Sequence, residues 1–410
     1  MTAKITSISV SGIRTLDSFT LDLNDLTVLI GENGSGKSSV VEAFELLRRL
    51  TSQNFVQEFN GIHGGEPALL RVGAGQISLV ARIEGDSWTA SYEVVIGKSG
   101  ITEERLSAST EGTTTLLLSG TGNKIDIHVR KGINAKVGHS TQLNRSTTLQ
   151  QAAIALNGWS HPDPIVQEVS VALRAIDVQL PFNTMSNWAA RSQGRPLSPL
   201  RDSVTIAPVD RLERFGVNLP NAYYVLRNDS SADEWSYTME LVRLGLGSWV
   251  ESVNARADVG GGKIALWIKP NCIDSQIPAA SLSDGQLAYL AFVALARLPT
   301  DRSVLVFDEV ELHLHPRLLT QVLSLLQSIA QKTPVVLTTH SRQLLDNLND
   351  PAKSVGVLEL DPQTLRTTLQ RFDKQALGEW LEDYGGLGQL LDAGYQESLF
   401  TAPTSHVEVR

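Results

Sequence analysis

The sequence predicts an α/β fold that combines a parallel sheet with an antiparallel β-meander and an inserted, mainly helical region. Three patterns indicate this class. A strand, a glycine-rich loop and a helix follow one another near the start, β-branched stretches with turn residues fill 77–129, and a strand–helix–strand unit follows residue 300. We expect a first lobe over 1–135, the helical insertion over 136–250 and a second lobe over 251–410.

The first lobe begins with the alternating stretch "ITSISVSGI", which is typical of a strand. "FTLDLNDLTVLI" predicts two more strands, and the second ends in an apolar run that reaches Ile30. The loop "GENGSGKSS" comes next. The helix predicted after it, "SSVVEAFELLRRL", places Val40, Phe44 and Leu47 on one face. "ISLVARIEGDSWTASYEVVIGKSG" then starts the meander.

The later parts change from helical patterns to α/β order. "TLQQAAIALNGW" and "DPIVQEVSVALRAI" indicate helices within 148–250. "SVLVFDE" contains the continuous apolar run expected of a strand buried on both faces, and "PVVLTTHS" is a second such strand. The helix "PRLLTQVLSLLQSIAQ" lies between them and opens with Pro316. This unit predicts two parallel neighbouring strands.

Composition restricts the classes of function. The chain has 410 residues and a net charge of −9, so its surface as a whole should not attract nucleic acid, and any such contact needs a local patch. The apolar run 287–296 is too short to cross a bilayer and no signal peptide is evident, so we expect a cytoplasmic protein without a membrane partner. Cys272 is the only cysteine, which excludes an internal disulfide, and we interpret it as core filler.

The glycine-rich loop fits the phosphate-binding pattern G-x-x-x-x-G-K-[ST]. Its glycines let backbone N–H groups surround phosphate oxygens at the start of a helix. Lys37 is predicted to reach the β- and γ-phosphates of ATP, and the Ser38 hydroxyl to hold Mg²⁺. The predicted nucleotide-binding residues of this loop are Gly31, Asn33, Gly34, Ser35, Gly36, Lys37, Ser38 and Ser39.

Polar residues at two strand ends predict the rest of the site. Asp308 is expected to complete the magnesium site through water, and Glu309 to activate the attacking water. Carboxylates at strand ends also cap helices. We interpret this pair as part of the ATP site because the sequence also contains the phosphate loop. His340 ends the next parallel strand and should emerge at the same sheet edge, where we expect it to contact the γ-phosphate. The alternative is a histidine with purely structural partners.

A second glycine turn, "SLSDGQ", precedes an apolar helix far from the first. Ser283, Gly285 and Gln286 offer a hydroxyl, backbone N–H groups and an amide at a helix start, which again suits an anion. Because the chain has a single phosphate loop, we assign this turn to the ATP of a second subunit. The arrangement predicts a homodimer, or a higher oligomer.

Four stretches in this order, "GENGSGKSS", "LSDGQ", "VFDE" and "TTH", resemble the Walker A, signature, Walker B and H-switch motifs of ABC-type ATPases. The long interval between the first two is similar to the SMC/RecF-like branch, whose head is split into two lobes. "DEVELHLHP" resembles OLD-like ATPases, and Arg14 stands where that group has a basic residue. The resemblance implies a switch that binds and hydrolyses ATP, dimerises on ATP and controls a separately encoded effector, for which we expect a nuclease, in anti-phage defence.

Other interpretations stay open. A RecF-type DNA-repair ATPase without an effector is the main rival, and a transporter motor is disfavoured by the motif spacing. Residues 342–410 are too few for the nuclease domain of OLD proteins, so we expect the chain alone not to cut nucleic acid, and we expect its tail to form an amphipathic helix with an acidic face. His313 and His315 suggest either a metal pair or, preferably, a loop that touches the partner. The glutamine of the family's Q-loop is not placed. One set of arginines is expected in a solvated loop, with a nucleic-acid contact as the alternative: Arg191, Arg195, Arg201, Arg211 and Arg214.

Overall fold

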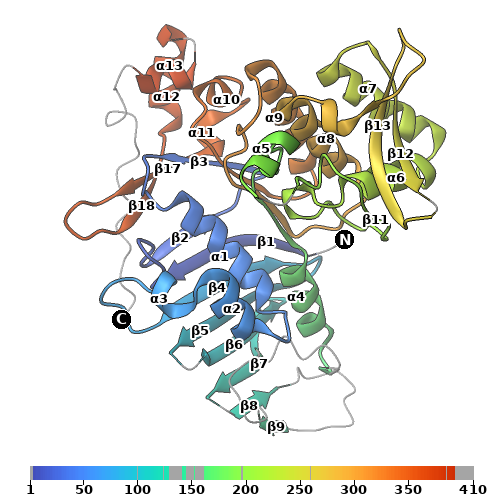
Figure 1. Cartoon of the computed structure of the whole chain (residues 1–410). Coiled ribbons are helices and arrows are strands. Elements are labelled where there is room, and N and C mark those ends of the chain that lie inside the picture. The colour runs from blue at the N-terminus through green and yellow to red at the C-terminus, as the bar shows by residue number, and fades with distance from the viewer. Residues whose placement is uncertain are drawn as a thin grey trace.

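The predicted α/β class is confirmed by the computed structural model of the chain (Figure 1). The structure describes residues 3–98, 100–122, 124–128, 141–144, 152, 161–194, 197–258, 260–384 and 386–392. In this part of the chain the strands form an eight-stranded, a six-stranded and a four-stranded sheet.

The eight-stranded sheet is the predicted antiparallel meander, extended by the first two strands of the chain. Its order is β2-β1-β4-β5-β6-β7-β8-β9, and all of its pairings are antiparallel. The strands are β1 (Lys4–Ser11), β2 (Phe19–Asp22), β4 (Ile77–Glu84), β5 (Thr89–Gly97), β6 (Gly100–Thr110), β7 (Thr113–Thr121), β8 (Lys124–Ile127) and β9 (Thr141–Asn144). Helices α2 (Phe55–His63) and α3 (Gly65–Leu69) lie between β3 and β4 in the chain.

The six-stranded sheet is parallel except at one edge. Its order is β10-β15-β16-β3-β17-β18, and only β18 is antiparallel to its neighbour. The strands are β10 (Ile176–Gln179), β15 (Val304–Phe307), β16 (Val335–Thr338), β3 (Leu26–Gly31), β17 (Val355–Leu360) and β18 (Thr367–Arg371). Helix α9 (Pro316–Ala330) connects β15 to β16, which confirms the predicted strand–helix–strand unit.

This parallel sheet separates two hydrophobic cores. Successive residues of a strand point to opposite faces. Val304 and Val306 therefore pack into the core shared with the meander, whereas Leu305 and Phe307 pack into the core shared with the later helices. Burial on both faces explains the unbroken apolar runs seen in the sequence. Val40, Phe44 and Leu47 of α1 (Lys37–Arg49) are fully buried, as their spacing predicts.

The middle of the chain is helical but also supplies strands. The helix predicted over 163–176 is α4 (Pro164–Arg174), whereas the one predicted over 148–159 falls almost wholly outside the described residues. β10 was not expected, and it enters the central sheet beside β15. The other elements of this region are α5 (Asn187–Ser192), β11 (Val204–Thr205), α6 (Leu219–Asn228) and α7 (Ala232–Leu246).

The remaining elements complete the second half. β11, β12 (Val250–Asp258), β13 (Lys263–Pro270) and β14 (Ile277–Pro278) form the four-stranded sheet. The later helices are α8 (Asp284–Arg297), α10 (Arg342–Asp346), α11 (Pro351–Ser354), α12 (Lys374–Tyr384) and α13 (Leu387–Asp392). α12 is the helix predicted in the tail, although the side chains of its acidic face lie outside the described residues.

Two observations bear on the composition arguments. Cys272 is exposed, so the expectation that it fills the core is wrong; it follows β13 in a connecting loop where no apolar layer covers it. Among the described helices, none combines the length and apolarity needed to span a bilayer.

Candidate nucleotide-binding site

The loop between β3 and α1 has a backbone that requires glycine. Gly31, Gly34 and Gly36 have φ angles of 153°, 85° and 102°, which side-chain-bearing residues rarely adopt. A Cβ atom on Gly36 would lie 2.6 Å from Oγ1 of Thr367, so β18 approaches the loop closely. The Thr367 hydroxyl donates to the carbonyl of Ser35 at 2.9 Å and braces the loop from outside.

Lys37 begins α1 and lies over this loop. Its Nζ atom donates to the carbonyls of Gly31 at 2.7 Å and Glu32 at 2.9 Å, and the residue is 7% exposed. Burial lowers the pKa of Lys37, while the nearby charges of Asp308, Glu309 and Glu311 act in the opposite direction. The N-terminus of α1 has no side-chain cap and no acidic residue in its first turn, so its N–H groups can donate hydrogen bonds to an anion.

The carboxylates predicted at the end of β15 differ in their bonding. Oδ1 of Asp308 accepts a hydrogen bond from the Thr338 hydroxyl at 2.5 Å, and that hydroxyl accepts one from the Glu309 backbone N–H at 2.8 Å. Glu309 has a left-handed backbone, with φ of 47°. Its carboxylate makes no hydrogen bond to the described residues, so it can accept a proton from water. Left-handed non-glycine residues are uncommon and concentrate at functional sites.

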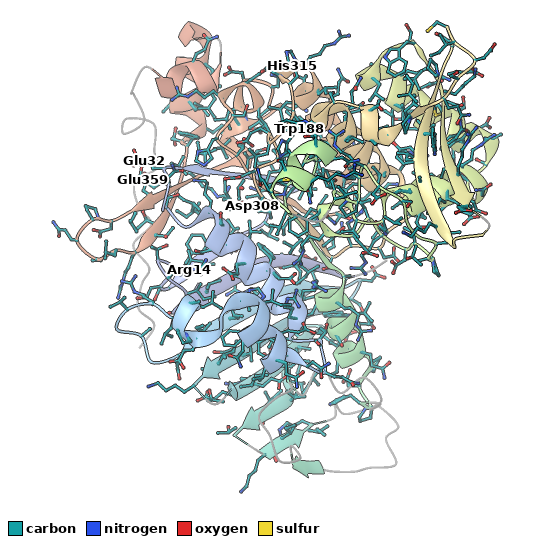
Figure 2. The ribbon with its side chains drawn as sticks, in the orientation of Figure 1. Arg14, Glu32, Trp188, Asp308, His315 and Glu359 are labelled. Carbon is teal, nitrogen blue, oxygen red and sulfur yellow. The ribbon has the colours of Figure 1, made fainter. Side chains whose placement is uncertain are left out.

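His340 follows β16, and its ring is exposed. Because β3, β15 and β16 are parallel and adjacent, their carboxyl ends share one edge of the sheet. The structure therefore brings the phosphate-binding loop, Asp308, Glu309 and His340 together, as predicted. Figure 2 labels Glu32 and Asp308, which mark the ends of β3 and β15.

The signature-like turn starts α8. Ser283 is the N-cap of a capping box: its hydroxyl accepts from the Gln286 N–H at 3.3 Å, and the Gln286 side chain accepts from the Ser283 N–H at 3.0 Å. The Ser283 hydroxyl keeps its own proton for a further acceptor. No hydrogen bond or ion pair in the described part joins residues 281–286 to residues 31–39.

The expected solvated arginine loop is wrong for two residues. Arg201 has a side chain only 4% exposed, and it pairs with Asp284 and donates to the carbonyls of Ala280 and Leu282 beside the signature turn. Arg214 pairs with the buried Glu45 of α1. Each guanidinium is therefore engaged by a partner within the protein. Arg191 is exposed, Arg211 is partly buried, and Arg195 lies outside the described residues.

Two polar residues near the site were missed. Gln179 ends β10, and its carbonyl accepts the Asp308 N–H at 3.1 Å, so a glutamine does stand at a strand end beside the Walker B carboxylate. In this strand, "IDVQ", the buried Asp177 forms an ion pair with Arg302 at 2.7 Å. The acidic residue interrupts the apolar pattern, so the sequence did not predict a buried strand here. Glu311 lies two residues after Glu309, and both of its carboxylate oxygens are bonded to the turn that carries His340.

The other residues singled out in the sequence have structural partners. Arg14 forms an ion pair with Glu42 of α1 at 2.6 Å. Nδ1 of His315 accepts the Arg317 N–H and caps α9, and in the described part of the chain no three or more metal-ligating side chains gather.

The donor set suits ATP with Mg²⁺. The buried hydroxyl of Ser35 has no protein partner, the N-terminus of α1 is uncapped, and the Lys37 ammonium lies beside both. Ser38 and Asp308 offer hydroxyl and carboxylate oxygens, the ligands that Mg²⁺ prefers.

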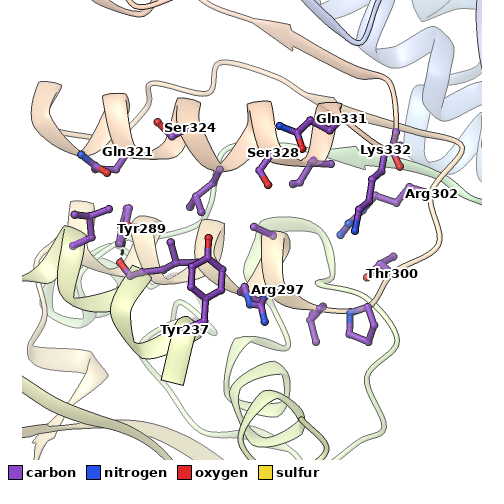
Figure 3. Close-up of a pocket in the computed structure, with 18 of the residues that line it drawn as sticks. Tyr237, Tyr289, Arg297, Thr300, Arg302, Gln321, Ser324, Ser328, Gln331 and Lys332 are labelled. Atoms are coloured by element: carbon purple, nitrogen blue, oxygen red, sulfur yellow. Dashed lines mark hydrogen bonds between the residues drawn. The ribbon is translucent and has the colours of Figure 1, made fainter. Parts of the chain in front are cut away.

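A second hollow, of about 610 Å³, lies elsewhere. It is bounded by α7, α8 and α9 (Figure 3). Thr300 and Arg302 line it just before β15, and Lys332 and Thr333 just before β16. It is therefore at the opposite edge of the sheet from the phosphate-binding loop and is not the nucleotide site.

Two domain families match the sequence. One, described as "AAA ATPase domain", matches residues 4–98. The other, described as "AAA domain, putative AbiEii toxin, Type IV TA system", matches residues 246–346. Curated proteins offer no match.

Three solved SMC head domains are similar in fold. One, bound to the C-winged helix domain of ScpA, is 13% identical, with coverage of 91% of this chain and 99% of that one and a TM-score of 0.50. The head from Thermotoga maritima is 14% identical, covering 90% and 99%, with a TM-score of 0.44. A head from Pyrococcus furiosus with an extended coiled coil, bound to the C-terminal domain of ScpA, is 12% identical, covering 93% and 99%, with a TM-score of 0.48.

The phosphate-binding loop at the edge of a parallel sheet, together with the two matched AAA domains, defines an ATPase. The chain contains two regions that match AAA ATPase domains, and its fold is similar to that of an SMC head domain.

Proposed function

We propose that the chain is an ATP-driven molecular switch that closes as a homodimer around two ATP molecules and reopens on hydrolysis. The observation that carries this is the division of the site. One chain holds the phosphate loop, Asp308, Glu309 and His340 at one sheet edge, while no hydrogen bond or ion pair among the described residues joins its signature turn to that loop. A second copy supplies the missing turn.

In each site the residues have separate roles. Lys37 and the N-terminus of α1 bind the β- and γ-phosphates, and Glu309 takes the proton of the attacking water. Ser38 and Asp308 hold Mg²⁺, which neutralises charge on the phosphate oxygens. His340 contacts the γ-phosphate, and Ser283, Gly285 and Gln286 approach it from the other subunit.

Exposed apolar side chains near the same edge support dimerisation. Trp188 of α5 is 77% exposed, and Leu312 in the loop after β15 is 41% exposed. Both belong to segments that follow strands ending at the nucleotide site. Tryptophans are enriched at protein interfaces, where they bury a large area at little cost in conformational entropy.

We further propose that the switch controls a separately encoded effector, a nuclease, in anti-phage defence in the cytoplasm. Support comes from the toxin–antitoxin description of the family matched over residues 246–346 and from the resemblance of "DEVELHLHP" to OLD-like ATPases. The RecF-type alternative requires a surface that binds DNA. It is disfavoured because Arg201 and Arg214 form ion pairs within the protein and do not form a basic surface.

Glu309→Gln tests the core of the proposal. The substitution keeps the shape but removes the base, so hydrolysis should fall by about a hundredfold or more while ATP still binds. With ATP and magnesium the variant should accumulate as a dimer in native mass measurements. Lys37→Ala is the matched control: it loses the loop's cation and should neither bind ATP nor dimerise. A Glu309→Gln chain that stays monomeric where the wild type dimerises would contradict the switch.

A further inference from the structure

The loop of residues 309–315, between β15 and α9, is tightly wound. Glu309 and His313 both have left-handed backbones, with φ of 47° and 67°. The Leu312 N–H donates to the Glu309 carbonyl at 3.1 Å, and the Leu314 N–H to the Glu311 carbonyl at 3.0 Å. Strained backbones of this kind persist only where surrounding contacts hold them, and they concentrate at functional sites.

Glu311 fastens the loop to the turn that carries His340. One carboxylate oxygen accepts the Thr339 hydroxyl at 2.8 Å, and the other accepts the backbone N–H of His340 at 2.6 Å. Thr339 is fully buried and Glu311 is partly buried, so the first bond is partly shielded from water. Hydrogen bonds to an ionised carboxylate are stronger than neutral ones. Both oxygens of Glu311 are thus used in holding the His340 turn.

The other end of the same loop presses on the signature turn. A Cβ atom on Gly285 would lie 3.0 Å from the His313 carbonyl oxygen and 3.4 Å from a methyl carbon of Leu318. Glycine, which has no Cβ, lets the first turn of α8 approach the loop this closely. Because protein interiors are close-packed, a shift of His313 toward α8 would push on the start of that helix.

We propose that Glu311 is a positioning residue that couples His340 to the signature turn of the same chain. When the γ-phosphate engages His340, the backbone of that turn shifts and carries Glu311 with it. The loop of residues 309–315 transmits this shift through His313 to Gly285. The shift of Gly285 positions the signature turn relative to the ATP of the other subunit. This inference rests on the proposed function, in which the signature turn acts between subunits.

The test uses steady-state ATP hydrolysis by Glu311→Gln and by Thr339→Val. Thr339→Val removes the hydroxyl donor while keeping the branched shape. Each should lower kcat about tenfold and leave KM for ATP within about twofold, because the phosphate-binding residues are untouched. Glu84→Gln is the matched control, since it removes the same charge from an exposed strand end. Its kcat should equal that of the wild type.

A double-mutant cycle separates coupling from a merely structural role. If Glu311 acts through His340, then Glu311→Gln should cause no further loss of kcat in a His340→Ala background. A full tenfold loss in that background, or wild-type kcat in both single variants, would overturn the inference while the switch itself stands. A wild-type chain that fails to hydrolyse ATP would overturn the proposed function as well.

Discussion

Single buried side chains decide how the signature turn is presented, and Arg201 is the clearest case. Its guanidinium joins three stretches of chain that are far apart in sequence. It donates to the carbonyls of Thr184 at 2.8 Å, Ala280 at 2.8 Å and Leu282 at 2.7 Å, and it pairs with Asp284. Thr184 follows β10, the strand next to Asp308, so one arginine connects the segment after β10 to the turn that we propose acts in trans.

Arg201→Met should therefore impair hydrolysis without impairing ATP binding. Methionine fills the space but leaves three carbonyls and Asp284 without their donor, and a buried polar group without a partner costs about 1–3 kcal/mol. We expect kcat to fall about tenfold and the dissociation constant for ATP, measured calorimetrically, to stay within about threefold. Arg191→Met, at an exposed arginine of α5, should match the wild type. Unchanged kcat in Arg201→Met would exclude this role.

Among the elements, α1 joins the phosphate loop to the inserted region. Its Glu45 has a side chain 4% exposed and pairs with Arg48 at 2.7 Å, with Arg49 at 2.5 Å and with Arg214 of the insertion. Burial alone would raise the pKa of Glu45, but the hydrogen bond from Arg48 and the charges of the three arginines outweigh it and lower the pKa. The helix that binds phosphate is thus tied to the segment that holds the signature turn.

Glu45→Gln should destabilise the protein, because three arginines then surround a neutral side chain. Breaking a buried ion pair costs about 3–5 kcal/mol, and we expect a loss of about 3 kcal/mol, read from the urea midpoint. The pH dependence has a definite sign. A lowered folded-state pKa contributes stability above the ordinary value of 4.5 and loses it as the pH falls through the folded-state pKa. The variant should lose less stability than the wild type on acidification; an equal loss would contradict the assignment.

At the scale of the whole molecule, the proposed dimer makes two chains depend on each other. A chain with Ser283→Arg keeps its own phosphate loop but offers a blocked signature turn, and a chain with Lys37→Ala does the reverse. Each alone should be inactive. In a mixed dimer one site combines both intact parts and the other combines both defects.

Mixing the two variants should thus restore hydrolysis, at about half of the wild-type rate per mixed dimer, since each mixed dimer has one working site. ATP turnover, measured together with native mass to count mixed dimers, checks this. Normal hydrolysis by Ser283→Arg alone, or no recovery when mixed dimers are present, would show that the turn does not act between subunits.

The sequence by itself determined the fold class and most of the candidate site. Glycine has a unique backbone freedom, so "GENGSGKSS" after an apolar strand specifies its own loop conformation. The apolar runs of β15 and β16 specify strands buried on both faces, and parallel neighbouring strands must place Asp308 and His340 at one edge. These patterns are local in the sequence, so they do not depend on how the rest of the chain packs.

Only the tertiary structure decided how the polar residues between these motifs are used. Asp177 sits in a buried strand because Arg302, 125 residues later, neutralises it, and Arg201 is buried because the carbonyls around the signature turn converge on it. In the sequence nothing distinguishes Glu311 from the other acidic residues that follow Phe307. The fold places its carboxylate against Thr339 and His340. A charged side chain is stable in the protein interior only when it has a partner. Partners that are distant in sequence leave no local pattern, so the roles of these residues could be identified only from the tertiary structure.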